Sequence, residues 1–235
     1  MTDDDGVLLF TYRGCTFRIA DGVQPPKAGS LLFCRLLDVR PGERVLEIGS
    51  GAGLAAVLLA RAGAHVIATD IRPEAVACTR ENAARNGVAE RVEARCGDGF
   101  APVAGLRFDL ICTSPPQMPT PPGRERDDAE AAADNGGPDG WALLERVIRE
   151  ASDHLTPGGR LVFTLFAFLG IERAQATLRA AGLEPIIVGR EPQGFPRIGY
   201  ERLEHLRRMD TEGTIPRDAL PRTVDRYVVA GRRPA

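Results

Sequence analysis

The feature that most constrains this chain is a run of nine residues, 45–53, in which a short apolar stretch leads directly into three alternate glycines. Residues 45–48 have the composition of a buried strand, and residues 54–62 form an apolar segment of good helix formers. A strand, a glycine turn and a helix in this order are typical of the nucleotide-binding corner of an open α/β sheet. Glycines permit the tight turn and the close approach of a ligand, and the helix start offers unpaired N–H groups.

Three interpretations of this loop are open on the glycine spacing alone. The pattern Gly51-x-Gly53-x-x-Ala56 fits the dinucleotide loop of dehydrogenases loosely. A tight turn without any ligand is the second interpretation, because a lone glycine pattern is a weak signal. The third is a site for S-adenosylmethionine (SAM). The stretch resembles the first motif of class I SAM-dependent methyltransferases, because acidic Glu47 stands two positions before Gly49, where dehydrogenases usually carry an apolar residue.

Length and composition exclude several classes of protein. A chain of 235 residues with 43% apolar content suits one α/β domain with small additions. Its 30 basic and 32 acidic residues give a net charge of −2, which argues against a broad, non-specific nucleic-acid surface. The five cysteines and three histidines are dispersed, so we expect neither a disulfide framework nor a metal site. The start lacks a signal-peptide pattern and no apolar run could span a membrane, so we expect a cytoplasmic protein.

Strand and helix patterns alternate along most of the chain. Residues 7–10 and 15–19 predict an N-terminal hairpin, and residues 30–39 predict a helix. The remaining patterns predict strands at 64–69, 91–95, 108–112, 160–165, 183–188 and 224–230, and helices at 73–86, 141–155 and 170–181. Together they predict an α/β fold: a Rossmann-like, seven-stranded, mostly parallel sheet with helices on both faces. We expect residues 1–40, the hairpin and first helix, to cap the cofactor site, and residues 41–235 to form a SAM-dependent methyltransferase domain.

Two segments depart from this alternation. Residues 118–140 combine several prolines and glycines with a charged tract and have no apolar period. A loop of this length inside a compact domain is usually functional or disordered, and we favour a lid over a substrate site, with a solvated linker as the alternative. Residues 189–223 are charged and rich in arginine, and their pattern predicts no particular fold.

Ligands of open α/β sheets bind beyond the carboxyl ends of the strands, and that is where the informative residues lie. Asp70 follows Gly53 by seventeen residues, close to the spacing of an acid that holds ribose hydroxyls. A helix N-terminal charge is the alternative for Asp70. Asp98 is expected to accept from an adenine amino group or, alternatively, to be an exposed turn residue. The expected cofactor-binding residues are Glu47, Gly49, Ser50, Gly51, Gly53, Asp70, Ile71, Asp98, Gly99 and Ser114.

The stretch Ser114-Pro115-Pro116-Gln117 ends the fourth predicted sheet strand. Two prolines after a buried strand stop its ladder and hold the next side chains rigid. The stretch resembles the amino-methylating branch of the family, in which Asn/Asp-Pro-Pro-aromatic occupies this place; a simple strand terminator is the alternative. Residues 22–26 and 134–140 also resemble HemK-type protein-glutamine methyltransferases, and residues 157–161 are similar to the superfamily's late turn. The resemblance covers about residues 7–188, lacks the N-terminal helical domain of some members, and implies an antiparallel last strand.

Two departures from that resemblance bear on the methyl acceptor. The family has Asn in place of Ser114 and usually Tyr or Phe in place of Gln117, and that pair holds the accepting amide. We therefore expect Ser114, the Pro115 carbonyl and Gln117 to aim an acceptor lone pair. The expected reaction is methylation of a nitrogen or other heteroatom of a small polar molecule, and release-factor glutamine is not the expected acceptor. The alternatives are a protein-glutamine N-methyltransferase, an NAD-dependent oxidoreductase and a non-catalytic SAM-binding protein.

Overall fold

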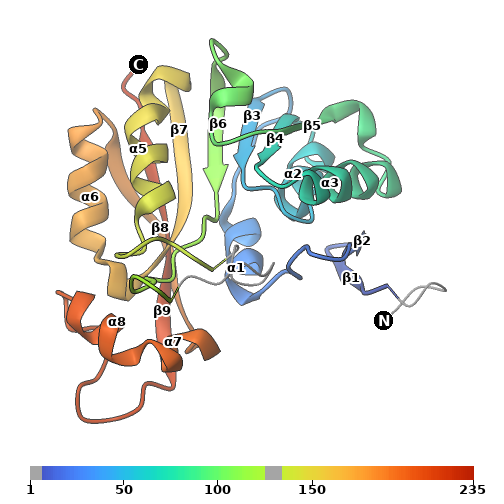
Figure 1. The fold of residues 1–235 in the computed structure, drawn as a ribbon. Coiled ribbons are helices and arrows are strands. Elements are labelled where there is room, and N and C mark those ends of the chain that lie inside the picture. The colour runs from blue at the N-terminus through green and yellow to red at the C-terminus, as the bar shows by residue number, and fades with distance from the viewer. Residues whose placement is uncertain (1–6, 125–133) are drawn as a thin grey trace.

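The computed structural model of the chain describes residues 7–124 and 134–235. A seven-stranded sheet runs through the centre with helices on both faces, and a two-stranded hairpin lies beside it (Figure 1). The strands are β1 (Leu9–Tyr12), β2 (Cys15–Arg18), β3 (Arg44–Ile48), β4 (His65–Asp70), β5 (Val92–Cys96), β6 (Phe108–Thr113), β7 (Leu155–Phe166), β8 (Glu184–Gly194) and β9 (Thr223–Arg232). The helices are α1 (Ala28–Leu36), α2 (Leu54–Arg61), α3 (Pro73–Arg85), α5 (Ala142–His154), α6 (Ile171–Ala180), α7 (Arg197–Glu201) and α8 (Leu203–Met209), with short 3-10 turns η1 (Ala89–Arg91), η2 (Ala101–Val103) and η3 (Ala167–Leu169).

The strands of the large sheet lie in the order β5-β4-β3-β6-β7-β9-β8. β3 pairs in parallel with β4 and with β6, and β6 pairs in parallel with β7. β9 runs antiparallel to both of its neighbours. The sequence prediction of a Rossmann-like, mostly parallel sheet with an antiparallel last strand is confirmed. Because β9 runs the opposite way, its first residues lie at the edge where the parallel strands end.

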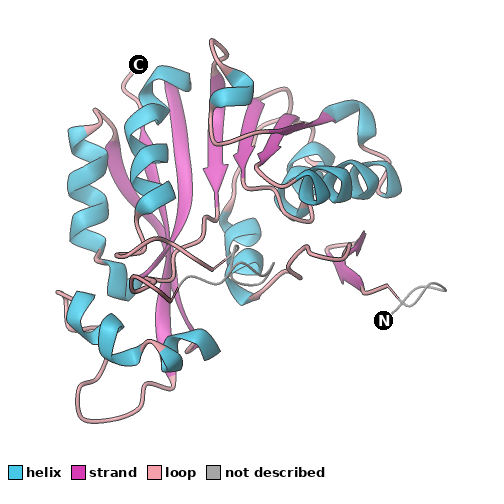
Figure 2. Ribbon diagram, in the orientation of Figure 1, coloured by secondary structure: helices cyan, strands magenta, loops and turns pink. Residues whose placement is uncertain are grey.

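Side chains of the central strands alternate between two hydrophobic layers. Ile111 and Phe163 belong to the layer that includes α5 and α6, whereas their neighbours Leu110 and Val162 belong to the layer that includes α1, α2 and α3. This is the two-residue period of a strand. Helices therefore cover both faces of the sheet (Figure 2), which explains why its central strands are apolar on both sides.

Several predicted boundaries differ from those observed, most of all in β7, β8 and α1. β7 begins at Leu155 rather than at residue 160, because Leu155 pairs with Phe108 and the register then shifts before Arg160 pairs with Leu110. β8 continues to Gly194 rather than ending at residue 188, because its antiparallel pairing with β9 extends to Thr223, the first residue of β9. α1 begins two residues earlier than predicted and ends at Leu36. Backbone pairing with a distant partner sets the first two boundaries, and local composition does not encode it.

The segment whose fold the sequence did not predict, residues 189–223, supplies the end of β8 and helices α7 and α8. Arg202, between the two helices, is buried and donates to the carbonyl of Pro119 at 3.2 Å and to the Thr120 hydroxyl at 2.8 Å. Met118 also donates its N–H to the Asp134 carbonyl at 2.9 Å. These contacts hold the two ends of the predicted lid loop together. The middle of that loop, residues 125–133, lies outside the described residues.

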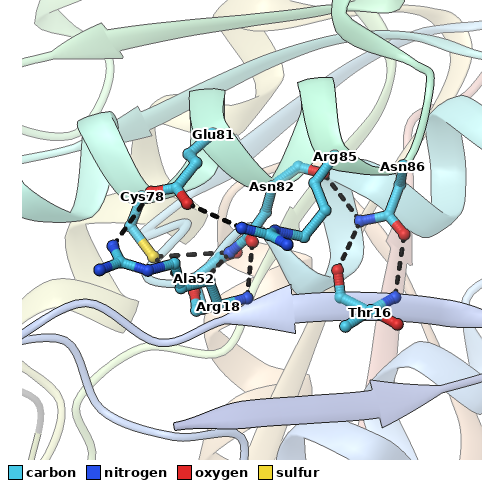
Figure 3. Close-up of polar contacts among 8 residues, drawn as sticks. All are labelled: Thr16, Arg18, Ala52, Cys78, Glu81, Asn82, Arg85 and Asn86. Carbon is cyan, nitrogen blue, oxygen red and sulfur yellow. Dashed lines mark hydrogen bonds and ion pairs between the residues drawn. The ribbon is translucent and has the colours of Figure 1, made fainter. Parts of the chain in front are cut away.

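The N-terminal hairpin is attached by two asparagine side chains, one in α3 and one directly after it (Figure 3). Asn86 accepts from the N–H of Thr16 and donates to its carbonyl, both at 2.9 Å. Asn82 does the same for Arg18, at 2.8 and 2.9 Å, and it also donates to the carbonyl of Ala52 at 2.9 Å. The two carboxamides therefore satisfy main-chain groups of β2 that would otherwise lack partners. Asn82 also couples the hairpin to the turn that precedes α2.

The described helices are short relative to a bilayer. The longest of them, α3 and α5, have 13 residues each, whereas a helix needs about 20 apolar residues to cross a membrane. Within residues 7–124 and 134–235, none of the helices has the length and apolar character to do so.

Candidate active site

The three glycines after β3 divide into two kinds. Gly49, Gly51 and Gly53 all have positive φ, at 78°, 54° and 75°. A Cβ on Gly49 or Gly51 would meet no atom within 4 Å, whereas a Cβ on Gly53 would lie 3.0 Å from Thr79. The first two glycines therefore leave open space for a ligand beside the loop. The third permits close packing of the loop against α3.

Asp70, at the end of β4, supports the glycine loop directly. One carboxylate oxygen accepts from the N–H of Gly51 at 2.9 Å, and the other accepts from the N–H of Arg72 at 3.0 Å. An ionised carboxylate has about four lone-pair sites, so each oxygen keeps capacity for a ligand hydroxyl. Asp70 also lines a cavity of about 240 Å³ next to the loop. Its position suits both the loop and a bound ligand.

Glu47 is buried beneath the same loop. Its carboxylate accepts from the N–H of Ala56, in the first turn of α2, at 2.9 Å. Burial raises the pKa of Glu47 to about 8; the negative charge of Asp70 adds to the rise, and the hydrogen bond from Ala56 opposes it. At neutral pH the side chain is therefore mostly protonated, and it can donate as well as accept a hydrogen bond.

The other expected cofactor residues occupy different environments. Ser50 is buried, and its hydroxyl lies 2.9 Å from that of Thr79. Ile71 is 66% exposed beside Asp70, as an apolar residue that contacts a flat ring would be. The carboxylate of Asp98 is engaged by the Arg146 guanidinium of α5, which lowers the pKa of Asp98. Of the two roles predicted for Asp98, its environment fits that of an exposed, ion-paired turn residue better than that of an acceptor for an adenine amino group.

Two adjoining cavities contain most of the predicted site. The smaller, of about 240 Å³, is lined by Asp70, Ile71, Asp98 and Gly99. The larger, of about 600 Å³, is lined by five of the predicted cofactor residues and by all three predicted catalytic residues, with Ser114 in both sets: Glu47, Gly49, Ser50, Gly51, Ser114, Pro115 and Gln117. Gly49, Gly51 and Ser114 line both cavities, whereas Gly53 lines neither. The carboxyl ends of β3, β4 and β6 thus meet at one cleft, as expected.

At the far end of the larger cavity, Gln117 connects the loop after β6 to β7. Its amide nitrogen donates to the carbonyl of Thr164, and its amide oxygen accepts from the N–H of Phe166 at 3.3 Å. The side chain is only 2% exposed. The Ser114 hydroxyl lies 3.1 Å from the Thr164 hydroxyl. Gln117 therefore uses its polar atoms to hold main-chain groups in place, whereas the sequence led us to expect them to face an acceptor.

Sequence reasoning missed Arg226, near the start of β9. Its guanidinium lies 3.4 Å from the centroid of the Phe166 ring and donates to the Gln117 amide oxygen at 3.3 Å. Burial lowers the pKa of Arg226 to about 9, and the charge of Asp134 opposes the effect. A charged residue inside a predicted apolar strand was the available signal. Thr164, which contacts both Ser114 and Arg226, was missed as well.

These features fit an adenosine-containing cofactor with a charged tail. The glycine loop is open to a ligand, and a carboxylate and an exposed aliphatic side chain follow the adjacent strand. A polar cavity continues from there toward β7 and β9. The loop and the residues around it thus suit SAM, with a second space for a methyl acceptor.

Comparison with known proteins gives the same result. The Methyltransferase small domain family matches residues 24–123. A release factor glutamine methyltransferase of Cereibacter sphaeroides is 38% identical over 203 residues, which are 82% of this chain and 71% of the relative. A ribosomal protein uL3 glutamine methyltransferase of Bradyrhizobium diazoefficiens is 39% identical over 127 residues, but the match covers 51% of this chain and 40% of that protein.

The fold is shared with solved methyltransferases at lower identity. A structure of the E. cuniculi Mtq2–Trm112 complex, which is responsible for methylation of the termination factor eRF1, superimposes with a TM-score of 0.60 at 16% identity. The match covers 90% of this chain and 99% of that chain. Sequence identity and coverage of the Cereibacter relative establish the kinship, and the structural neighbour establishes the fold. The chain belongs to the HemK-type family of class I SAM-dependent methyltransferases.

Proposed function

We propose that this SAM-dependent methyltransferase methylates the side-chain amide nitrogen of a glutamine in a protein. The observation that carries the proposal is the position of Ser114 and Pro115 in the cavity that the glycine loop also lines, with Pro116 in the adjoining smaller cavity. Relatives that share this chain's sequence over much of its length are named as glutamine methyltransferases. They favour the protein-glutamine alternative over the small polar molecule that the sequence placed first.

The cofactor half of the site would hold SAM through the residues around the glycine loop. Asp70 would accept hydrogen bonds from the ribose hydroxyls, and Ile71 would contact the adenine ring. Glu47 would form a hydrogen bond with the polar tail of the cofactor. The remaining contacts proposed are those of Gly49, Ser50, Gly51, Gly99 and Ser114. Gly53 would act indirectly, by packing the loop against α3, and Asp98 would contribute little because it is paired with Arg146. Residues 22–24 and several residues of α1 line the two cavities, which supports a capping role for part of the 1–40 segment.

SAM supplies an electrophilic methyl group. In the transfer, a bond forms between the amide nitrogen and the methyl carbon, the carbon–sulfur bond breaks with its electron pair staying on sulfur, and the nitrogen loses one proton to solvent. The chain contributes by positioning, which accounts for most of the catalysis in a displacement of this kind. The Ser114 hydroxyl and the Pro115 carbonyl would accept from the amide N–H groups, and the two prolines would keep these acceptors rigid.

The test is a methyl-transfer assay with matched peptides. The protein and SAM are incubated with glutamine-containing peptides from a release factor and from ribosomal protein uL3, and with the same peptides carrying Glu in place of Gln. The expected result is release of S-adenosylhomocysteine and a methyl group on the glutamine, located by mass spectrometry, with the Gln peptides only. Transfer to small polar metabolites with no modification of any glutamine peptide would return the assignment to a small-molecule acceptor.

A single substitution sharpens this assay. Ser114→Asn introduces the residue that the family carries and should raise activity on the glutamine peptide if the acceptor is a carboxamide, because an amide matches both its donor and its acceptor. Adding Gln117→Tyr to this variant would be less informative, because it would also remove the hydrogen bonds of Gln117 to the main chain at Thr164 and Phe166. A drop in glutamine methylation in the folded Ser114→Asn variant would count against the proposal.

A further inference from the structure

The guanidinium of Arg226 has hydrogen-bonding capacity that the described residues do not use. One terminal nitrogen, Nη1, donates to the Gln117 amide oxygen at 3.3 Å and to the Thr164 hydroxyl at 3.4 Å. Nε is buried, and neither Nε nor Nη2 makes a hydrogen bond to any described residue. Within residues 7–124 and 134–235, no carboxylate forms an ion pair with it. Buried polar groups normally have partners, so donors left over beside a cavity need an explanation.

The guanidinium is also held in a fixed orientation. The Phe166 ring lies 3.4 Å from its central carbon, and Phe166 is the residue directly opposite Arg226 in the β7–β9 pair. A Cβ on Gly29 of α1 would lie 3.2 Å from that carbon and from Nη2. Gly29 therefore leaves just enough room for the guanidinium. A planar cation stacked on an aromatic ring and fixed by two oxygen acceptors is pre-organised to bind a further oxygen.

The position of Arg226 relative to Ser114 suggests what that oxygen is. Both residues line the larger cavity. The Ser114 hydroxyl and Nη1 of Arg226 approach the same Thr164 hydroxyl, at 3.1 and 3.4 Å. A carboxamide carries a donor nitrogen and an acceptor oxygen on one carbon. It can therefore donate a hydrogen bond to the Ser114 hydroxyl and accept one from Arg226 at the same time.

We propose that Arg226 is the residue that recognises the acceptor, by donating to the carbonyl oxygen of the glutamine carboxamide whose nitrogen is methylated. The inference rests on the proposed function. It explains how a site with Ser114 and an occupied Gln117 can still hold both ends of an amide. The cation also draws electron density toward the amide oxygen, which makes the N–H proton easier to lose as the new bond forms.

The first experiment compares Arg226→Met with Arg226→Lys, Gly29→Ala and the control Arg190→Met. Arg190 is an exposed β8 arginine that pairs with Asp225 away from the cavity, so its variant removes the same charge elsewhere. Arg226→Met should raise KM for the glutamine peptide about tenfold or more, as expected for loss of a charged hydrogen bond. Gly29→Ala should raise it less, Arg226→Lys should recover part of the loss, and Arg190→Met should match the unmodified protein.

Two further readouts separate recognition from a structural role or a cofactor role. SAM affinity by calorimetry should stay within about twofold in Arg226→Met, and its Tm should be equal or higher, because an apolar side chain replaces a buried cation that has no ion-pair partner among the described residues. An unchanged KM for the peptide would overturn the inference. The inference would also be overturned if weaker SAM binding by Arg226→Met accounted for all of its loss of activity on the glutamine peptide.

The second experiment does not depend on methyl transfer. The Nε–H resonance of Arg226 is assigned by its absence in Arg226→Lys and followed by nitrogen-15 NMR with S-adenosylhomocysteine bound. N-acetylglutaminamide should shift this resonance, whereas N-acetylnorleucinamide, which lacks the side-chain amide, should not. Equal responses to both compounds would overturn the inference. A specific shift without methylation of any glutamine peptide would contradict the proposed function alone, and methylation that is independent of Arg226 would contradict the inference alone.

Discussion

The two halves of the cleft are built in different ways. The cofactor half is formed by residues close in sequence: Gly51 bonds to Asp70 nineteen positions away, and Ser50 contacts Thr79 at a separation of twenty-nine. The acceptor half is assembled from distant segments. Gln117 reaches Thr164 across forty-seven positions and Arg226 across one hundred and nine.

The two halves of the cleft depend on different numbers of chain segments, so substitutions should affect them differently. The glycine loop and its supporting carboxylate belong to one β–α–β unit, so a ligand site forms wherever that unit folds. The acceptor half requires the loop after β6, the end of β7 and the start of β9 to be in register together. We therefore expect a change in these segments to affect the acceptor half more than the cofactor half. One family can thus keep its cofactor while its acceptors differ.

The largest effect should come from Gly51→Val, which targets the cofactor half. Gly51 has a φ of 54° and open space on its Cβ side, so a branched side chain strains the loop and fills the space of the ligand. SAM binding by calorimetry should be lost. Gly42→Val is the matched control: Gly42 has a φ of 85° and equally open space but lies outside both cavities. Normal SAM affinity in a folded Gly51→Val variant would rule out this loop.

Gln117→Leu should separate the two halves. It removes the partners of the Thr164 carbonyl and the Phe166 N–H, and each buried group left unpaired costs about 1–3 kcal/mol. Denaturant unfolding should therefore show a loss of stability of that order, and turnover of the acceptor should fall. SAM affinity should remain within about threefold, because the glycine loop is untouched. A parallel loss of SAM affinity would mean that the two halves are coupled.

Within the cofactor half, Asp70→Ala and Asp98→Ala should behave differently. Loss of a charged hydrogen-bond acceptor usually costs about 1.5–3 kcal/mol, so Asp70→Ala should weaken SAM binding about tenfold to a hundredfold. Asp98 is 52% exposed and paired with Arg146, so its substitution should change affinity less than about threefold. Calorimetry on both variants decides. Equal losses would show that Asp98 contacts the cofactor despite its ion pair.

The smallest effect expected is a change in how stability depends on pH, caused by Glu47. Its pKa is raised from 4.5 to about 8 in the folded chain, so between these values the folded state binds more protons than the unfolded state. Stability from this group is therefore complete below about pH 4.5 and declines as the pH rises to about 8. Glu47→Gln keeps an acceptor for Ala56 and has no such decline. The Tm of Glu47→Gln minus the Tm of the unmodified protein should therefore increase from pH 5 to pH 8. A Tm difference that stays constant over this range would contradict the raised pKa of Glu47.

The sequence alone determined the seven-stranded, mostly parallel sheet and the position of the glycine loop at the carboxyl end of its first strand. These features follow from local rules, because an apolar run of strand length and a glycine turn have the same meaning in any α/β chain. Asp70, Ile71 and Ser114 line one cavity, as the sequence predicted, because each lies at or directly after the end of a parallel strand and parallel strands end at a common edge.

Only the tertiary structure decided what the side chains at the acceptor end do. Gln117 was expected to face an acceptor, yet the end of β7 presents a carbonyl and an N–H that its amide satisfies. Arg226 could not be assigned to the site because its place depends on the register that sets it opposite Phe166, sixty residues earlier in the chain. Register between distant strands is fixed by the packing of the whole sheet, and no local pattern of residues encodes it.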